Sequence, residues 1–342
     1  MIKEINILGI ETSCDETAAA VVADGRNIKS SVVASQDKLH EKFGGVVPEI
    51  ASRAHIEKIY PVVARAIEQA GATKETIDAV AVANRPGLVV SLIVGVTAAK
   101  TLAFAWGKPL IAVNHVHAHL QSAMLAQDKL DLPAVALVVS GGHTSLYDCE
   151  SGLDLTLIGS TIDDAAGEAF DKVAAILKLG YPGGPSIEKI AANGDAKAIE
   201  FPRSMLGSDS LDFSFSGIKT AVLYHCRGQD MKGEDRVESM SQNEKADIAA
   251  SFQAAVVDVL VAKTKRAADR INAKTVLLGG GVAANTTLRQ KLTGVCDATK
   301  RKLLIAPKRL CTDNAVMVAS LAYHKFKVGR FADLALEAVA TS

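Results

Sequence analysis

The chain has 342 residues, 49% of them hydrophobic, and its 38 basic and 38 acidic residues give a formal net charge of zero. This length exceeds one ordinary core and predicts two lobes. Proteins that bind nucleic acid over a broad surface are usually basic, so any nucleic-acid contact here must be local or shared with a partner. Aromatic residues make up only 4%, which argues against a base-stacking platform for single strands.

The cysteines and the chain start indicate a reduced, soluble protein. The five cysteines are odd in number, widely spaced and without a C-x-x-C pair, which fits a reducing cytosol better than a disulfide framework. The first eleven residues carry charges where a signal peptide needs an apolar run. No segment reaches the roughly 18 uninterrupted apolar residues of a membrane span, and the apolar segment 88–99 is typical of a buried helix. We therefore expect a cytoplasmic protein.

The first third of the chain predicts a mixed α/β lobe. Three β-branched, apolar segments read as a meander of strands, and a segment with helical spacing follows. Another strand, a helix and a final strand complete the order β-β-β-α-β-α-β. The segments are strands 5–11, 18–23 and 27–34, helix 48–70, strand 79–83, helix 91–105 and strand 110–114.

The same order then restarts, with an insertion at about residues 163–244 that is partly helical and carries loops at 207–212 and 227–242. The repeated segments are strands 133–139, 144–149 and 155–159, helix 246–268, strand 275–278, helix 282–292, strand 302–306 and helix 313–323. Two copies of one topology predict duplicated RNase H-like domains facing a cleft. We expect an N-terminal lobe over residues 1–128, against which a C-terminal helix at 325–342 packs, and a C-terminal lobe over 129–324.

Three polar or glycine-rich turns lie at strand ends in this repeated order, at residues 11–17, 140–144 and 279–281. Backbone N–H groups in such turns can bind a phosphate, and glycines let an anion approach closely. Together they favour the two-lobed sugar kinase/Hsp70/actin architecture, in which a nucleotide lies at the bottom of the cleft. Any single one of them can equally be an ordinary tight turn. Asn285 is expected on the first turn of the helix that follows the third.

Residues 114–120 read N-H-V-H-A-H-L and hold three of the eight histidines. Asn114 is a candidate N-cap for a helix that begins at His115. On that helix His115 and His119 share a face, because they are four residues apart, whereas His117 points away. The pair could bind one metal ion or form a surface pattern. A zinc peptidase would need H-E-x-x-H, and Val116 stands where the glutamate belongs.

A metal ion needs a third ligand, and the repeated topology suggests Asp313, at the start of the last helix of the second copy. His115 lies at the equivalent junction of the first copy, so we expect Asp313 to face the histidines across the cleft. The alternative is that Asp313 is an N-cap, which is a common use of aspartate at such a place.

Nine motifs, in order along the chain, identify the chain as a member of the TsaD family, also called Gcp, which is related to the Kae and Qri proteins. The motifs are G-I-E-T-S-C-D-E-T (9–17), F-G-G-V-V-P-E-I-A-S-R-A-H (43–55), N-H-V-H-A-H (114–119), V-S-G-G-H-T (139–144), D-D-A-A-G-E-A-F-D-K (163–172), Y-P-G-G-P (181–185), D-F-S-F-S-G-I-K-T (212–220), G-G-G-V-A-A-N (279–285) and C-T-D-N (311–314).

The resemblance implies transfer of a threonylcarbamoyl group from threonylcarbamoyl-AMP to N6 of adenosine 37 in tRNAs that read codons beginning with A, which forms t6A and releases AMP. It implies the metal ligands His115, His119 and Asp313, with Fe2+ as the metal and zinc or another ion as the alternative. It also implies a TsaB-like paralogue, a TsaE-like ATPase and a TsaC-like enzyme that makes the adenylate. The substrate-binding positions that it implies are Val138, Val139, Ser140, Gly141, Gly142, Asp171, Gly184, Glu188 and Asn285.

The mechanism expected from this chemistry needs a positioned donor and a base. Asp171 and Glu188 are expected to accept hydrogen bonds from ribose hydroxyls. The alternative for Asp171 is an ion pair with Lys172 or another surface partner, and the alternative for Glu188 is a solvated helix residue. Asp15 and Glu16, in the first polar turn, are candidates for removing a proton from the amine, although Asp15 fits a turn role equally well.

The chain departs from the family's usual G-P-G-L-x-G-S-L, because Arg85 and Val90 replace two glycines. Three rival functions remain open on the sequence: a kinase or actin-like ATPase of the same fold, a metallopeptidase, and a non-catalytic scaffold.

Overall fold

The computed structural model describes residues 3–125, 130–207, 209–228 and 236–341. The chain forms two compact units. Unit 1 comprises Met1–Leu130, Ser151–Asp154 and Ala306–Ser342, and unit 2 comprises Asp131–Glu150 and Leu155–Ile305. The first junction lies close to the expected boundary at residue 128. Residues 306–324, which the sequence assigned to the second lobe, belong instead to unit 1.

Unit 1 is built on a five-stranded sheet with the order β3-β2-β1-β4-β5. Its strands are β1 (Asn6–Glu11), β2 (Glu16–Ala23), β3 (Asn27–Ser35), β4 (Ala79–Arg85) and β5 (Leu110–Asn114). The strand β1 pairs antiparallel with β2 and parallel with β4. Because β4 and β5 are also parallel to each other, the carboxyl ends of β1, β4 and β5 lie at one edge, where polar turns follow.

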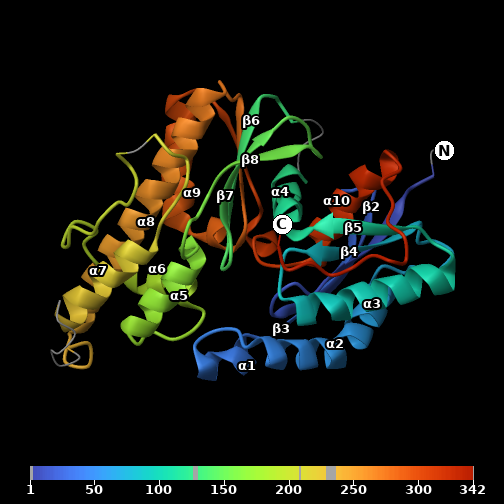
Figure 1. Ribbon diagram of the computed structural model, residues 1–342, viewed down its shortest axis with the longest axis horizontal. Coiled ribbons are helices and arrows are strands. Elements are labelled where there is room, and N and C mark those ends of the chain that lie inside the picture. Colours follow the sequence, from blue (N-terminus) through green and yellow to red (C-terminus); the bar gives the residue numbers. More distant parts are fainter. Residues whose placement is uncertain (1–2, 126–129, 208, 229–235, 342) are drawn as a thin grey trace. The chain divides into compact units, whose positions relative to one another are not determined.

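Helices cover both faces of this sheet (Figure 1). On one face, alternate strand residues such as Leu8 and Val80 pack against α2 (Pro48–Gln69) and α3 (Val89–Trp106). On the other face, Ile7 and its neighbours pack against α10 (Ala315–Lys327). The strands are buried on both faces, which explains their near-continuous apolar sequence. The remaining helices of the unit are α1 (Asp37–His40), η1 (Glu41–Phe43), α4 (His115–Met124) and η3 (Lys308–Leu310).

Helix α3 is long and apolar enough to cross a membrane by length and composition, with a mean hydropathy of 1.8, but only 33% of it is buried in the structure. Val96, Ala99 and Ala103 form its inner stripe and contact the sheet. Val90 and Ile93 remain 45% and 49% exposed. The expectation of a buried helix therefore holds for one side of α3 only.

Unit 2 contains a second five-stranded sheet with the order β10-β9-β6-β7-β8. Its strands are β6 (Ala134–Val139), β7 (Thr144–Cys149), β8 (Leu155–Ser160), β9 (Thr275–Gly279) and β10 (Lys302–Ile305). As in unit 1, the first strand pairs antiparallel with the second and parallel with the fourth. The two sheets thus have the same strand order and the same pattern of parallel and antiparallel pairs.

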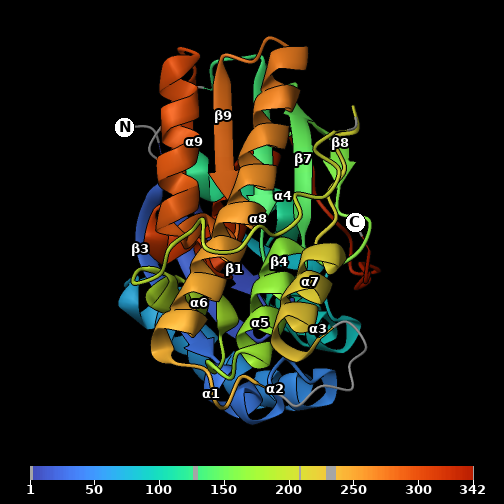
Figure 2. The same ribbon diagram turned by 90° about the vertical axis from the view of Figure 1, so that its left-hand side faces the viewer.

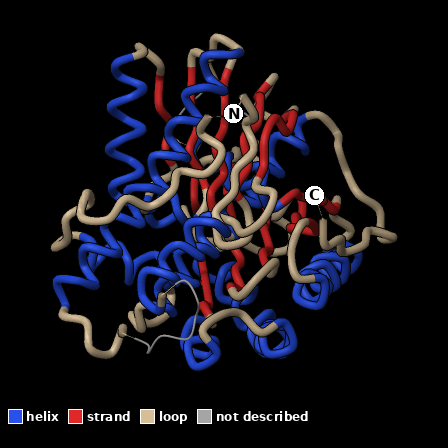
Figure 3. Tube along the Cα trace, turned by 60° about the vertical axis from the view of Figure 1, so that its left-hand side comes forward, coloured by secondary structure: helices blue, strands red, loops and turns tan. Residues whose placement is uncertain are grey.

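The helices of unit 2 include α8 (Gln242–Arg270), which runs along the sheet beside α9 (Thr286–Ala298) (Figure 2). The expected insertion contains α5 (Ala166–Ile176), α6 (Gly183–Ala191) and α7 (Ser216–Arg227). A short loop joins α5 to α6 and a long loop joins α6 to α7; loops are tan in Figure 3. Part of the expected loop at 227–242, residues 229–235, lies outside the described residues, as does residue 208. Instead of one helix over 282–292, the chain forms η2 (Gly281–Ala284) and then α9, so Asn285 is the N-cap of α9 and not a first-turn residue.

The C-terminal segment completes unit 1, but not as a helix. Helix α10 ends at Lys327, and residues 328–341 contain no helix. The expected helix at 325–342 is therefore wrong beyond Lys327. The segment is held on unit 1 by backbone hydrogen bonds, from Ala332 N to Leu110 O and from Val339 N to Asn84 O.

Candidate functional site

The three histidines of N-H-V-H-A-H open helix α4, as the sequence predicts. The Asn114 side chain caps this helix by accepting a hydrogen bond from the backbone N–H of His117, at 3.1 Å. Helical spacing then places His115 and His119 on one face. Their ring centroids are 4.7 Å apart and their planes are nearly perpendicular, at 80°. Both residues are buried.

Asp313 joins this pair. Its Oδ1 atom lies 3.5 Å from Nε2 of His115 and 3.2 Å from Nε2 of His119, and one ligand atom from each of the three residues lies within 4.8 Å of the others. The expected ligand set is therefore brought together. The expectation that Asp313 belongs to a facing lobe is wrong, because all three residues lie in unit 1. Helix α10, which follows Asp313, packs on the first sheet and on α4.

The alternative role of Asp313 as a helix cap is also wrong. The N-cap of α10 is Asn314, whose side chain accepts a hydrogen bond from the backbone N–H of Met317 at 3.0 Å. Asp313 precedes the cap, so its carboxylate is not needed to satisfy the helix end and is directed toward the two histidines.

The His119 side chain shows that this cluster suits a metal ion. Both of its ring nitrogens are buried, and neither has a hydrogen-bond partner among the described residues. The 3.2 Å approach to Asp313 is an ion-pair distance without hydrogen-bond geometry. A buried imidazole with unsatisfied nitrogens costs about 1–3 kcal/mol. Two imidazoles and one carboxylate that leave further positions open are a common donor set for iron or zinc, so the residues present fit the implied metal.

Glu11, the last residue of β1, orients His115 from behind. Its Oε2 atom lies 2.9 Å from Nδ1 of His115, and Ser13 Oγ lies 3.0 Å from the same nitrogen. Although burial lowers the pKa of His115, the carboxylates of Asp313 and Glu11 outweigh burial and raise it to about 9. A metal-binding histidine characteristically gives its second nitrogen to a carboxylate in this way. This role of Glu11 was not predicted from the sequence, where its position at a strand end in the first polar turn is the signal that points to it.

His117 lies outside the group formed by His115, His119 and Asp313, here called the metal cluster, as expected. Burial, with Lys325 and Arg85 contributing, lowers the pKa of His117 to about 4. At neutral pH the side chain is therefore uncharged, and the backbone N–H of His117 donates to the capping Asn114.

The two candidate bases belong to an acidic group formed by Asp15, Glu16 and Asp37. One carboxylate oxygen from each lies within 4.8 Å of the others. Burial raises the pKa of both Asp15 and Glu16, and the negative charge of Asp313 raises each further. The acidic group and the metal cluster therefore share one electrostatic environment within unit 1.

A buried histidine holds the turn that carries this acidic group. His55, on α2, is fully buried, and its Nε2 donates to the carbonyl of Cys14 at 3.0 Å. Its Nδ1 therefore accepts from the Thr17 hydroxyl at 2.8 Å. These bonds suit neutral imidazole, and burial correspondingly lowers the pKa of His55. The contacts bracket Asp15 and Glu16 in the chain and fix the backbone between β1 and β2.

In unit 2, the Ser140–His143 turn has the features of an anion-binding loop. The turn is closed by hydrogen bonds from Ser140 N to His143 O at 2.8 Å and from His143 N to Ser140 Oγ at 3.1 Å. Val138 and Val139, which precede it in β6, are fully buried. They can therefore support the turn but cannot present side chains to a ligand.

The glycines of this region fall into two kinds. At Gly280, which has a φ of +92°, an added Cβ would lie 2.3 Å from the carbonyl oxygen of Val139. This close packing fixes the glycine-rich turn at residues 279–281 against the end of β6. At Gly141, Gly142 and Gly184, nothing lies within 4 Å of an added Cβ. Their backbone is therefore open to approach by a ligand.

The other expected substrate residues are already partly engaged. Asp171 Oδ1 accepts from Gly183 N at 2.7 Å, and Glu188 Oε1 accepts from Thr286 N at 2.8 Å. Asn285 caps α9 through Leu288 N at 2.9 Å and donates to Gln253 at 2.7 Å.

The alternative pairing of Asp171 with Lys172 is wrong. Lys172 instead lies 2.8 Å from both Asp164 and Glu168.

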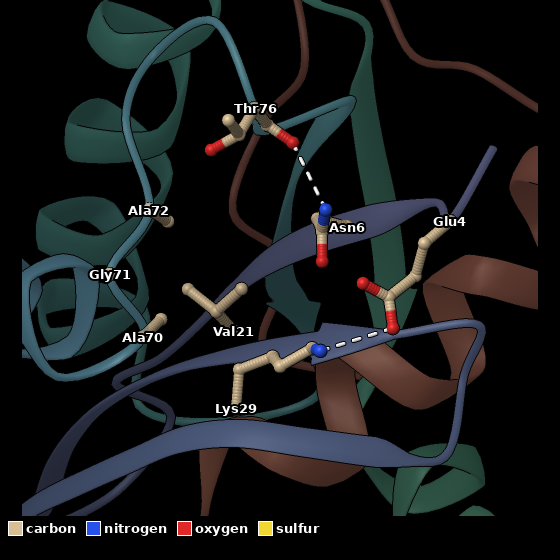
Figure 4. A pocket seen from close by; sticks show the side chains of 8 residues that line it. All are labelled: Glu4, Asn6, Val21, Lys29, Ala70, Gly71, Ala72 and Thr76. Atoms are coloured by element: carbon tan, nitrogen blue, oxygen red, sulfur yellow. Dashed lines mark hydrogen bonds and ion pairs between the residues drawn. The ribbon is translucent and has the colours of Figure 1, made fainter.

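A shallow hollow of about 210 Å³ lies at the opposite end of the first sheet, near the start of β1 (Figure 4). Its polar groups satisfy one another: Lys29 pairs with Glu4 at 3.1 Å, and Asn6 donates to the carbonyl of Thr76 at 3.2 Å. None of the residues that line it belongs to the metal cluster or the acidic group, so it is separate from the candidate site.

Comparison with solved structures defines the class. The fold matches full-length HypF in its phosphate- and nucleotide-bound form with a TM-score of 0.60 and 16% identity, over 97% of this chain and 48% of that one. It also matches (R)-2-hydroxyglutaryl-CoA dehydratase component A of Acidaminococcus fermentans with a TM-score of 0.52 and 17% identity, over 94% and 98% of the two chains. The molecule is an α/β protein with two mixed sheets, consistent with the sugar kinase/Hsp70/actin fold.

Sequence comparison then defines the family. The family model for TsaD, tRNA N6-adenosine threonylcarbamoyltransferase, matches residues 27–320. The enzyme of that name from Moorella thermoacetica is 51% identical, over 99% of this chain and 98% of the relative, and that from Rhodopirellula baltica is 52% identical, over 97% and 95%. The chain belongs to this family of transferases, which confirms the resemblance seen in its motifs.

Proposed function

We propose that this chain transfers the threonylcarbamoyl group from threonylcarbamoyl-AMP to N6 of adenosine 37 in tRNAs that read codons beginning with A, forming t6A and releasing AMP. Family membership supports the t6A product. The observation that carries the assignment of a chemical centre is the orphaned imidazole of His119 beside His115 and Asp313. Transferase family membership also decides against the kinase, peptidase and scaffold alternatives.

The reaction needs activation of a poor nucleophile, because the lone pair of the adenine N6 amine is delocalised into the ring. A metal held by His115, His119 and Asp313, Fe2+ in our proposal, would supply Lewis-acid polarisation of an oxygen ligand. The chain itself contributes the fixed geometry: Asn114 caps α4, and Glu11 holds the His115 ring with Nε2 toward Asp313. Ligands fixed in this way need no rearrangement during the reaction.

The donor is proposed to bind to unit 2 through backbone groups. The Ser140–Gly142 turn offers exposed glycine backbone for the phosphate or carboxylate of the adenylate, and Gly184 offers the same at the start of α6. The carboxylates of Asp171 and Glu188 are proposed to accept hydrogen bonds from ribose hydroxyls. In this proposal Asn285 shapes the site through its cap on α9, and Val138 and Val139 act only by packing.

Asp15 or Glu16 is proposed as the group that accepts the proton from the amine. Both lie in a turn that His55 fixes, and both share the environment of Asp313. Burial in a group of three carboxylates makes one of them readily able to accept a proton. In single-turnover reactions with preformed adenylate, Asp15→Asn and Glu16→Gln variants separate the two candidates. Unimpaired transfer in both would exclude this step.

The whole proposal is tested by incubating the purified chain with threonylcarbamoyl-AMP and an unmodified tRNA that reads a codon beginning with A. Mass spectrometry of the digested tRNA should show t6A, with AMP released in equal amount. A tRNA with guanosine at position 37 is the matched control. If no t6A forms with the full partner set and metal present, the proposal fails.

We propose a TsaB-like paralogue and a TsaE-like ATPase as partners, with a TsaC-like enzyme supplying the adenylate. Val90, Ile93 and Phe104 lie on one side of α3 and are 45%, 49% and 75% exposed. A row of exposed apolar side chains on one helix is characteristic of a protein interface, and we assign it to the paralogue. Ile93→Glu should abolish co-elution with the paralogue without changing metal content. Retained co-elution would contradict the assignment.

The proposal also covers the origin of the two units and the location of the protein in the cell. The matching strand orders of the two sheets support an origin of both units from one duplicated RNase H-like domain. All five cysteines are free, which agrees with the cytoplasmic location that we propose for a tRNA-modifying enzyme.

A further inference from the structure

Two basic side chains lie near the carboxyl end of the β4–β5 pair. Arg85 is the last residue of β4, and in the sheet it is the partner of Asn114, the last residue of β5. Lys325, on α10, reaches the same strand, where its Nζ donates to the carbonyl of Ala112 at 2.7 Å. The register of two strands and the packing of α10 thus bring two cations from distant parts of the chain to one strand end.

Neither cation has an acidic partner among the residues that the structure describes. Among residues 3–125, 130–207, 209–228 and 236–341, no carboxylate lies within ion-pairing distance of Arg85 or Lys325. Nearby Arg330 differs, because it pairs with Asp154 at 3.5 Å. Burial lowers the pKa of Lys325, and the positive charge of Arg85 lowers it further. Like charges held together without an acid favour a bound anion.

The position of this pair relates it to the metal cluster. Asn114 is both the partner of Arg85 and the N-cap of α4, and the next residue is the metal ligand His115. The Arg85 side chain is exposed, whereas Lys325 is half-buried. Arg85 can therefore contact a large ligand from outside while Lys325 strengthens the local positive potential. The C-terminal segment lies beside it, where Val339 N donates to Asn84 O and the Asn84 side-chain amide donates to Glu337 O.

We infer that Arg85, supported by Lys325, binds a backbone phosphate of the RNA acceptor; the presence of RNA at this edge rests on the proposed function. The zero net charge of the chain requires RNA contacts to be local, and an exposed guanidinium suits a phosphate bidentately. The adenylate also carries a phosphate, but the open glycine backbone proposed for it belongs to unit 2.

The test measures tRNA binding over a series of salt concentrations for the full chain and three variants. Arg85→Ala should weaken binding about fivefold near 0.1 M salt and reduce the slope of log affinity against log salt by about one. Arg85→Lys should keep the slope and lose part of the affinity, because it retains charge but not the planar fork. Arg65→Ala, which removes an exposed arginine from α2 of the same unit, is the matched control and should change neither.

Two further measurements, AMP affinity and metal content, distinguish RNA from the adenylate as the ligand of Arg85. AMP affinity and metal content should be unchanged in Arg85→Ala. If this variant binds tRNA with the wild-type affinity and slope, the inference is overturned, and a selective loss of AMP binding would assign the site to the adenylate instead. Failure of the wild-type chain to form t6A would overturn the proposed function, whereas the binding comparison does not depend on transfer.

Discussion

Glu11 and His115 are joined by a contact of 2.9 Å between Oε2 and Nδ1, which ties the end of β1 to the start of α4. With Nδ1 held by Glu11, Nε2 of His115 faces Asp313. The other Glu11 oxygen accepts a hydrogen bond from the backbone N–H of Ser13 at 2.6 Å, so Glu11 also restrains Ser13. The fully buried carboxylate of Glu11 therefore orients the His115 ring, because it binds the nitrogen on the opposite side from Asp313.

Substitution of Glu11 should weaken metal binding although Glu11 is not a ligand. Loss of such a supporting carboxylate typically lowers metal affinity about 10- to 100-fold. We expect about tenfold for Glu11→Gln, which keeps an acceptor oxygen, and about 100-fold for Glu11→Ala. Competition with a chromogenic chelator measures both. Wild-type affinity in the two variants would show that the contact does not support the ligand.

The three histidines of α4 should separate into two classes. His115→Ala and His119→Ala should lose most bound metal and with it t6A formation, because each removes one of three ligands. His117→Ala, on the same helix but outside the cluster, should retain most of both. Metal is measured by plasma mass spectrometry and transfer by nucleoside analysis. Equal losses in all three variants would contradict the i, i+4 assignment.

Metal removal should destabilise the wild-type protein more than a variant without the site. Binding to the folded state alone adds about 2.7 kcal/mol at a free metal concentration a hundredfold above Kd. Chemical unfolding with and without chelator should show this difference in unfolding free energy for the wild-type protein. The difference should be absent in His119→Leu. In chelator, His119→Leu should be at least as stable as wild type, because the ring nitrogens that it removes have no partner. A large loss of stability in chelator would disagree.

Two glycines of unit 2 should respond differently to alanine. Gly280→Ala should destabilise the protein by about 3 kcal/mol, since its Cβ meets Val139 O at 2.3 Å in a left-handed backbone. Gly142→Ala has room for its Cβ, so stability should change by less than about 0.5 kcal/mol, while KM for the adenylate rises. An unchanged KM for Gly142→Ala would remove this turn from the donor site.

Acidification should act on stability partly through His55. Burial lowers the pKa of His55 in the folded state, so the unfolded chain binds a proton more readily. The contribution of His55 is therefore present above its unfolded pKa of about 6.5 and is lost as the pH falls through the folded pKa. His55→Gln should flatten the fall in unfolding free energy between about pH 7 and pH 5, measured in chelator. Parallel profiles for variant and wild type would contradict this.

Periodicity in the sequence was sufficient for most elements of the fold. The strands buried on both faces carry near-continuous apolar residues, and the cap Asn114 marks a true helix start. The start of α8 was missed by four residues, because the capping box at Ser241 lies in a segment that the sequence assigned to a loop. The i, i+4 spacing of His115 and His119 also determined which two histidines share a face, because helix geometry is local.

Contacts between segments that are distant in the chain could not be predicted from sequence periodicity. Residues Ala315–Ala322 of α10 are all buried, so their pattern indicates a core helix but not which sheet it covers. The repeated topology suggested the second lobe for Asp313, and packing of α10 on the first sheet overrides it. The contact between Glu11 and His115 spans 104 positions, and no spacing rule predicts such a pair.

The membership of α10 in unit 1 has a consequence for synthesis. Unit 2 is complete once residue 305 has been made, whereas the first sheet lacks one of its covering helices until α10 emerges from the ribosome. Asp313 arrives with that helix. The nascent chain therefore carries two histidines without the facing carboxylate for nearly two hundred residues of translation (313 − 119 = 194), and the group of three candidate ligands is complete only after α10 has begun.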